Sequence, residues 1–281
     1  RGFASAWLAN IRGVDALTVL ALAGPRTARI ELGTFVVPTY PRHPSALAQQ
    51  ALTVQAATGN RLALGIGLSH RVTMEQGLGF DWDHPIRHTR EYLSVLTPLL
   101  AQEAAQFEGE EYTVRGYQLA MPGATPPPVL VAALGPQMLR LTGKMADGTA
   151  IWLGGERYIA ETAAPEITQA AERAGRPAPR VVAGLPICVT DDPGAVRDKV
   201  AQVFARYGDL PSYRAILDRA GAPGPAGIAL IDEAEVRAGL DALATAGVTD
   251  FAASLFVPRG EDRERTMAVL RDAGNGTRDA E

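Results

Sequence analysis

The sequence predicts an α/β protein built as an eight-stranded β/α barrel, or TIM barrel. Two observations lead to this prediction. Apolar runs typical of buried strands recur along the 281 residues, and each is followed by residues at helical spacing. Such alternation indicates a parallel sheet, and seven visible strands need one more to close a barrel. The rival architecture is an open, doubly wound sheet.

The expected strands are short and apolar, and several are rich in β-branched residues. The chain opens at Arg1-Gly2-Phe3 as though it were leaving an earlier helix, so the first strand of the barrel is expected to be missing from this chain. The predicted strands cover residues 4–9, 30–37, 61–66, 129–133, 148–153, 181–189 and 250–257.

The predicted helices follow these strands. Pro44 suits a first helical position, and Asp232 with Glu235 has capping-box spacing before a helix that ends near Gly247. One domain is expected over residues 1–281, with an insertion at about 72–128, a turn or hairpin within it near 107–112, and an extra helical segment at about 208–224. The main predicted helices cover residues 44–58, 85–100, 136–145, 162–174 and 193–207.

Composition excludes several classes of protein. Hydrophobic residues make up 47% of the chain, charged residues 21%, and the net charge is −4. No Lys/Arg run marks a nucleic-acid or anionic-membrane surface, and no apolar run reaches the roughly 20 residues of a membrane span. Cys188 is the only cysteine and cannot form an internal disulfide, which fits a cytoplasmic protein. We expect Cys188 to be a core residue and the partner to be a small molecule.

The stretch Leu64 to Arg71 is the most informative part of the chain. It follows a predicted strand, so in a barrel it lies at the catalytic mouth. Gly65 and Gly67 would let a ligand approach the backbone closely. Ser69, His70 and Arg71 then present a hydroxyl, an imidazole and a cation suited to the polar part of a cofactor. The alternative is a plain turn with a solvated histidine.

A second candidate site lies where the strand at 129–133 passes into a helix. Backbone N–H groups at a helix start attract anions without any charged side chain. The same geometry occurs in any βα turn, so an ordinary turn is the alternative. The residues concerned are Ala133, Leu134, Gly135, Pro136 and Gln137.

Other polar and aromatic residues fall near the same mouth. Asn10 closes the first predicted strand and places a polar side chain at the mouth, where it is expected to contact the cofactor. Thr34 ends the next strand and could donate to a ligand, or it could be an ordinary strand residue. Trp152 lies at a strand end, while Tyr207 and Tyr213 flank the extra segment. Segments inserted between βα units often cover the mouth, so these three rings are candidates for a substrate pocket, with core packing as the alternative.

A metal site is considered and not expected. His84 and His88 are four residues apart, with Asp81 and Asp83 just before them. No Glu stands in the metalloprotease position. The simpler interpretation is that Asp83 or His84 caps the helix, while His88 belongs to a solvated basic edge. Since no nucleophile–base pair is evident either, a bound cofactor is expected to do the chemistry.

Several of these stretches resemble the bacterial luciferase-like family, specifically its branch of coenzyme F420-dependent oxidoreductases. The most specific match is Asn60-Arg61-Leu62-Ala63-Leu64-Gly65-Ile66-Gly67. Pro211-Ser212-Tyr213-Arg214 resembles an actinobacterial subgroup. Further matches cover residues 2–7, 32–34, 87–93, 133–136, 146–148 and 246–251.

The resemblance implies an eight-stranded barrel, often dimeric, that binds coenzyme F420 and transfers a hydride at the deazaflavin C5. It implies a cis peptide bond between Phe35 and Val36, behind the deazaflavin ring, and His70 as the residue for any proton transfer. The chain departs from its relatives at His70, where several have an acidic residue, and at Asn10-Ile11, where many have Asp-His. Substrate chemistry is therefore not carried over. An FMN-dependent monooxygenase and a non-catalytic F420-binding protein remain alternatives.

Overall fold

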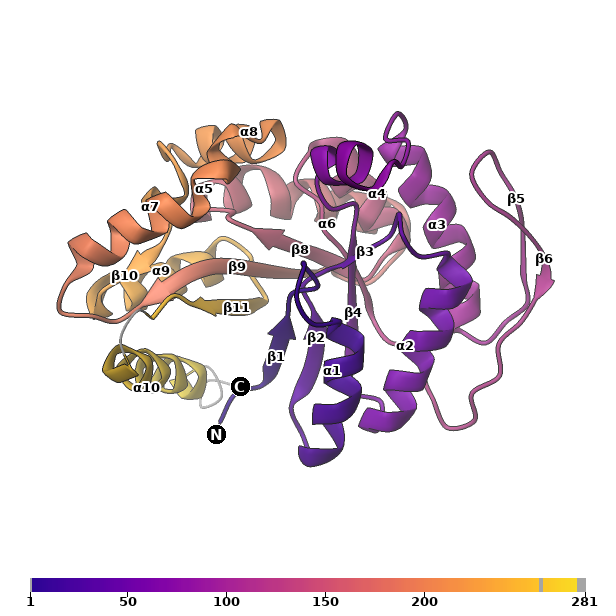
Figure 1. Ribbon diagram of the computed structural model, residues 1–281, viewed down its shortest axis with the longest axis horizontal. Coiled ribbons are helices and arrows are strands. Elements are labelled where there is room, and N and C mark those ends of the chain that lie inside the picture. The colour runs from indigo at the N-terminus through magenta and orange to yellow at the C-terminus, as the bar shows by residue number, and fades with distance from the viewer. Residues whose placement is uncertain (1, 258–259, 277–281) are drawn as a thin grey trace.

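The computed structural model describes residues 2–257 and 260–276, and its centre is a curled parallel sheet (Figure 1). The predicted alternation of strand and helix and all seven predicted strands are confirmed. Along the sheet the order is β1-β2-β4-β7-β8-β9, and β11 pairs with the other side of β9. These strands are β1 (Ser5–Leu8), β2 (Glu31–Thr34), β4 (Leu62–Gly67), β7 (Val129–Val131), β8 (Gly148–Trp152), β9 (Arg180–Cys188) and β11 (Asp250–Leu255).

One predicted strand differs from the structure. The run at 30–37 is divided into β2 and a separate two-residue strand, β3 (Val37–Pro38). β2 pairs with the start of β4, at Leu32 and Leu62, whereas β3 pairs with its end, at Val37 and Ile66. The chain bulges between them, and the Phe35–Val36 peptide bond in the bulge is cis, as the family resemblance implies. β10 (Leu230–Ile231) is a further short strand, paired with the end of β9.

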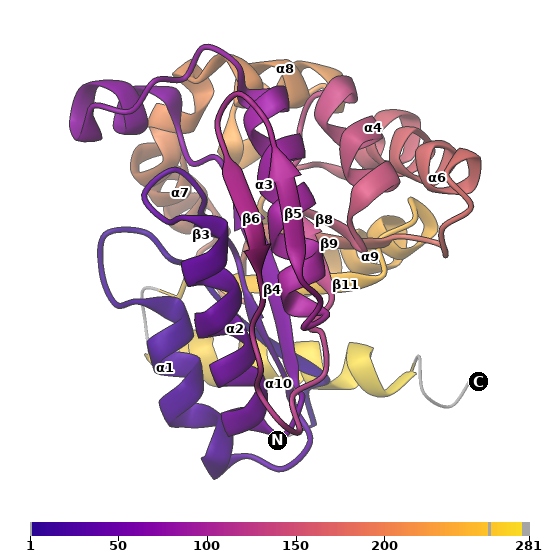
Figure 2. The same cartoon turned by 90° about the vertical axis from the view of Figure 1, so that its right-hand side faces the viewer.

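Helices cover the outer face of the sheet (Figures 1 and 2). Most lie where the sequence predicts them, because proline or a capping side chain marks their first turn. Helix α1 was not anticipated from the sequence; its N-cap is Asp15, whose carboxylate accepts a hydrogen bond from the Thr18 N–H. These helices are α1 (Ala16–Ala23), α2 (Pro44–Thr58), α4 (Pro136–Met145), α6 (Ala164–Arg173), α7 (Pro193–Asp209), α9 (Glu233–Thr245) and α10 (Gly260–Gly276).

The region after β4 departs from simple alternation. It contains a π-helical turn (Thr73–Gly77), helix α3 (Pro85–Leu100) and an antiparallel hairpin of β5 (Ala105–Glu108) and β6 (Thr113–Tyr117). The hairpin lies beside α3, outside the sheet (Figure 2), and confirms the turn predicted near 107–112. A second departure is α8 (Pro211–Ala220), which follows α7 directly and packs against it.

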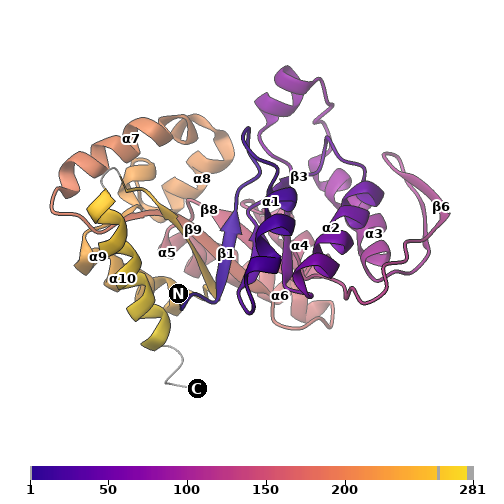
Figure 3. The same ribbon diagram turned by 60° about the horizontal axis from the view of Figure 1, so that its bottom comes forward.

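The sheet is open on one side. Within the described chain β1 pairs only with β2 and β11 only with β9, so no hydrogen-bonded ladder joins β1 to β11. Figure 3 shows these two edges facing one another, with α10 beside them. The curl of the sheet is therefore that of a barrel whose wall is interrupted between its first and last described strands.

A continuous hydrophobic core lies between the sheet and the helices. Leu47 and Leu52 of α2 and Leu62 and Leu64 of β4 are all at most 1% exposed. Cys188 is fully buried in a smaller cluster, as expected for a core residue. Among the described helices, none has both the length and the apolar character that a membrane span requires.

Candidate functional site

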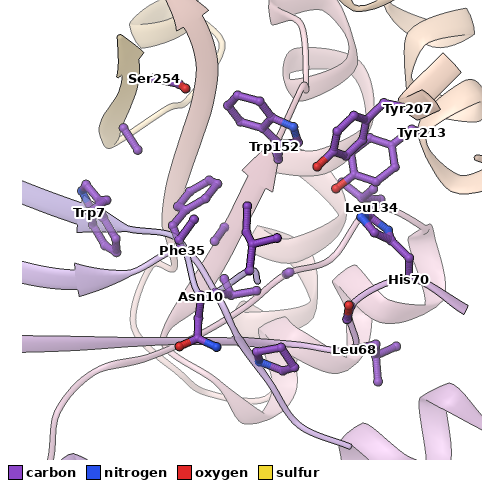
Figure 4. Close-up of a pocket in the computed structure, with 18 of the residues that line it drawn as sticks. Trp7, Asn10, Phe35, Leu68, His70, Leu134, Trp152, Tyr207, Tyr213 and Ser254 are labelled. Atoms are coloured by element: carbon purple, nitrogen blue, oxygen red, sulfur yellow. The ribbon is translucent and has the colours of Figure 1, made fainter. Parts of the chain in front are cut away.

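A large cavity opens at the carboxyl ends of the strands (Figure 4). Its volume is about 1660 Å³, and at the mouth it is lined by the ends of β3, β4 and β8 and by residues of α7 and α8. From there it continues along β1 and β11 to α10, so the volume includes the open side of the sheet. All three tryptophans of the chain, Trp7, Trp82 and Trp152, line it. The cavity thus reaches the mouth where the sequence places the candidate site.

The bulge after β2 forms part of the cavity wall. Phe35 and Val36 both line the cavity, and the Phe35 ring meets Trp7 edge-to-face at a centroid distance of 6.3 Å. Figure 4 shows Phe35 between Trp7 and Trp152. Thr34 is fully buried behind the bulge: its hydroxyl donates to the Gly65 carbonyl and accepts from the Gly65 N–H, both at 2.8 Å. It therefore does not present the hydroxyl that was expected for a ligand.

The glycines of β4 serve the bulge rather than a ligand. A Cβ on Gly67 would lie 2.7 Å from Val36 Cγ2 and 2.9 Å from Ala132 Cβ, and a Cβ on Gly65 would collide with the Thr34 carbonyl. Gly67 is buried and is not among the residues that line the cavity. The expectation that these positions let a ligand approach is thus corrected: they let the β2–β3 bulge approach β4.

Of the three polar residues in the turn after β4, two face the cavity and one does not. Ser69, with a positive φ of 65°, and His70 line the cavity. Arg71 does not; its guanidinium pairs with Glu75 at 2.8 Å and lies 3.9 Å from Asp83. The predicted cation beside His70 therefore turns toward the following loop.

An aromatic cluster forms the wall opposite the bulge, and it includes all three residues predicted for a substrate pocket. Tyr207 and Tyr213 meet edge-to-face at 4.8 Å, and His70 lies 5.6 Å from the first ring and 5.8 Å from the second. Trp152 lies 6.5 Å from Tyr207, and Phe204 lies 5.6 Å from Trp152 and 6.0 Å from Tyr207. The sequence brings His70 to this wall from β4 and the tyrosines from α7 and α8.

Burial sets the protonation of this wall. It lowers the pKa of His70 below its usual value, and the nearby Arg206 charge lowers it further. Burial also raises the pKa of Tyr207 and of Tyr213. At neutral pH the wall therefore presents a neutral imidazole and two protonated phenols, which can donate hydrogen bonds.

The turn between β7 and α4 contributes two of its five predicted residues. Leu134 and Gly135 line the cavity, whereas Ala133, Pro136 and Gln137 do not. The Tyr158 hydroxyl donates to the Leu134 carbonyl at 2.7 Å and fixes the turn. Gly135 is the N-cap of α4, and no side chain caps this helix. Its first N–H groups are thus open to an anion.

Asn10 lines the cavity from the end of β1. Its Oδ1 accepts a hydrogen bond from the Ala16 N–H at 2.8 Å, so the side chain also holds the start of α1. Asn10 is therefore both part of the cavity wall and a residue that stabilises the local backbone.

His84 and His88 have no part in the cavity. His84 is the N-cap of α3, and no side chain caps this helix, so the predicted side-chain cap is wrong. The Asp83 N–H donates to the Asp81 carboxylate in a turn before the helix. His88 is 3% exposed rather than solvated, and its ring bonds to Glu111 and Thr39. No cluster of three metal-ligand side chains occurs in the part of the chain that the structure describes.

Several cavity residues were not predicted from the sequence. Val203, Phe204, Arg206 and Leu210 line the cavity together with Tyr207. Their spacing places them on one face of α7, and that periodicity was the available signal. Trp82 and Met74 line the cavity from the loop after β4, where no regular pattern marks them.

Comparison with known proteins identifies the family. The family model for luciferase-like monooxygenases matches residues 1–273. The chain belongs to the luciferase-like monooxygenase family. Within this family it is similar to the 5,10-methylenetetrahydromethanopterin reductase of Methanolobus tindarius, with 30% identity over 281 residues, covering 98% of this chain and 84% of the relative.

Two solved structures share the family's fold with this chain. The coenzyme F420-dependent tetrahydromethanopterin reductase from Methanopyrus kandleri matches with a TM-score of 0.75 and 21% identity, over 96% of this chain and 89% of that one. The oxygenating constituent of 3,6-diketocamphane monooxygenase from Pseudomonas putida, in complex with FMN, matches with a TM-score of 0.72 and 15% identity, over 96% and 87%. This fold therefore occurs both in a structure named as coenzyme F420-dependent and in one in complex with FMN.

Proposed function

We propose that this chain is a coenzyme F420-dependent oxidoreductase that acts on a small organic substrate at the barrel mouth. The two facing walls of the mouth carry the proposal. The Phe35–Val36 bulge lies across the cavity from Trp152, Tyr207 and Tyr213, so an apolar support for a flat ring faces a second, aromatic wall where a substrate can bind beside it. The named function of the Methanopyrus kandleri structure and the reductase relative from Methanolobus tindarius support F420 as that cofactor.

The residues present fit a tricyclic deazaflavin with an anionic tail. Phe35, Val36 and Leu68 offer an apolar surface for the ring. Gly135 opens the uncapped start of α4, where a Cβ would meet nothing within 4 Å, and N–H groups there suit a phosphate. Asn10 and Ser69 supply polar groups at the rim.

When bound, the deazaflavin supplies a carbon centre, C5, that gives or takes a hydride. The chain's own residues orient the reactants and exclude water. The Phe35–Val36 bulge would hold the ring, and the wall formed by Trp152, Tyr207 and Tyr213 would bound the substrate. His70, kept neutral by burial, can accept a proton on its unprotonated ring nitrogen.

We further propose that the reaction takes place in the cytoplasm, which the lone Cys188 supports. The homodimer remains a prediction.

Titration with each cofactor tests the proposal. Trp7, Trp82 and Trp152 all line the cavity, so intrinsic tryptophan fluorescence reports binding there. Coenzyme F420 is expected to quench it at micromolar concentration, with FMN at least tenfold weaker. Tighter FMN binding would assign the chain to the monooxygenases, a reading favoured by the FMN-containing Pseudomonas putida neighbour. Quenching by F420 without turnover in a broad hydride-acceptor screen would leave the binding-protein alternative, and binding of neither cofactor to folded protein would refute the proposal.

A further inference from the structure

An exposed cation lies on the cavity rim. Arg206 projects from α7 among the residues that line the cavity, and its guanidinium makes no ion pair or hydrogen bond within the described chain. Its charge nevertheless reaches the aromatic wall, since it lowers the pKa of both His70 and Tyr207. A cation held beside a cavity without a partner is suited to an anion that enters the cavity.

Two phenol hydroxyls lie on the same wall. Tyr207 and Tyr213 stand edge-to-face, and Figure 4 shows their hydroxyl oxygens side by side. The Tyr213 hydroxyl makes no hydrogen bond within the described part of the chain. Burial keeps both phenols protonated, so each can donate to an acceptor in the cavity. Together with Arg206 they offer charge-assisted and neutral donors to one oxygen-rich group.

The remainder of this wall is aromatic and apolar. Trp152 and Phe204 continue the cluster from the tyrosines toward the strand ends, with edge-to-face contacts at 5.6 to 6.5 Å. Aromatic rings prefer planar π-systems as neighbours, in offset or edge-to-face arrangements. The same wall therefore favours a conjugated ligand over a globular aliphatic one.

We propose that the substrate is a planar, conjugated carboxylate, with its carboxylate held by Arg206 and the hydroxyls of Tyr207 and Tyr213. Its ring system lies against Trp152 and Phe204. This inference rests on the proposed oxidoreductase function and names the substrate class for the same cavity. The phosphate of the cofactor is assigned to α4 instead, so the two anions are bound by different elements of the mouth.

Binding of a matched pair of probes to the full chain tests the assignment without turnover. Cinnamate and cinnamamide have nearly the same shape, but only cinnamate carries a charge. Titration calorimetry is expected to give at least tenfold tighter binding of cinnamate. Arg206→Gln is expected to abolish this preference. Lys199→Gln is the matched control, because it removes the same charge from the same helix. Lys199 is exposed and does not line the cavity.

Three outcomes overturn the proposal: equal affinity for the two probes, no binding of either at millimolar concentration, or a preference that survives in Arg206→Gln. Titration of the variant with coenzyme F420 separates substrate from cofactor. An affinity within threefold of wild type is expected, whereas a tenfold loss would assign Arg206 to the cofactor. Failure of F420 to bind the wild type would refute the proposed function. The carboxylate preference would still be decided by the cinnamate and cinnamamide titrations.

Discussion

Single residues at the mouth owe their properties to neighbours far away in the sequence. His70 is only one position from Arg71, yet Arg71 pairs with Glu75, and the cation that acts on the imidazole is Arg206 of α7. Burial and this charge both lower the pKa of His70 below the usual value for a histidine. The imidazole is therefore neutral at pH 7, which a proton acceptor requires.

This arrangement predicts how His70 titrates. Because Arg206 disfavours the imidazolium, Arg206→Gln is expected to raise the pKa of His70, and Lys199→Gln to leave it unchanged. NMR titration of the imidazole protons measures both. An unchanged midpoint in Arg206→Gln would show that burial alone sets the pKa.

The same shift has a consequence for stability, whose sign follows from proton binding. Between the lowered folded pKa and the unfolded value of about 6.5, the unfolded chain binds more protons than the folded chain. His70 therefore adds to a loss of stability as the pH falls below about 6.5. His88, whose pKa burial also lowers, acts in the same direction.

For single residues, the sequence predicts which ones lie at the mouth but not where each side chain points. The strand-end rule places Asn10, Ser69, His70 and Trp152 at the mouth, where the structure has them. It cannot tell that Arg71 turns away, because a loop residue's direction depends on carboxylates that the fold brings beside it. Gly67 shows the same limit. The sequence indicates that a glycine is required there, but it does not show that Val36 of the bulge occupies the space a side chain would fill.

At the scale of elements, the insertion after β4 is tied to the mouth by a buried histidine. The carboxylate of Glu111, in the β5–β6 turn, can only accept a hydrogen bond, so His88 Nδ1 donates to it at 2.7 Å. The other ring nitrogen then accepts from the Thr39 hydroxyl at 3.0 Å, just after β3. The His88 ring also stacks on Tyr40, which stacks on Trp82 in the cavity wall. Three segments distant in sequence are joined at one ring.

Glu111→Ala is expected to destabilise the protein by about 1–3 kcal/mol, because it leaves a buried donor on His88 without an acceptor. Glu110→Ala is the matched control: the neighbouring carboxylate is 72% exposed and, among the residues that the structure describes, pairs with Arg87 alone, so its loss is expected to cost less than about 0.5 kcal/mol. Urea denaturation measures both. Equal losses would mean that the hydrogen bonds of His88 do not stabilise the insertion.

The sequence predicts the elements of this region better than their contacts. The bounds of α3 follow from Pro85 and from apolar periodicity, and Phe107 to Tyr112 marks the hairpin turn. The burial of His88 has no such signal, because its partners lie 49 and 23 residues away. The solvated edge predicted for it was wrong for that reason.

At the scale of the molecule, the open side of the sheet means that side-chain contacts across the interior must connect its two ends. Within the described chain no ladder joins β1 to β11, so the two ends of the sheet lack backbone hydrogen bonds to each other. At the amino ends of the strands Arg180 of β9 makes a bidentate contact with Glu31 of β2, at 2.8 and 2.9 Å. The same guanidinium contacts Asp250 of β11, at 2.6 and 3.2 Å, and lies 5.8 Å from the Trp7 ring centroid. One side chain thus connects both ends of the sheet across its interior.

Arg180→Ala is expected to lower the free energy of unfolding by about 2 kcal/mol, below the 3–5 kcal/mol of fully buried pairs because these groups retain some solvent contact. The side chains of Arg180, Glu31 and Asp250 are 27%, 30% and 19% exposed, so the variant leaves two carboxylates facing each other in a poorly hydrated space. Arg180→Lys keeps the charge but cannot contact both carboxylates with a planar fork, so an intermediate loss is expected. Arg237→Ala removes a surface pair with Glu233 and is expected to change stability little. If guanidinium denaturation gave Arg180→Ala and Arg237→Ala the same midpoint, the cross-sheet contact would not be what holds the two ends together, and packing along the interior would have to do so.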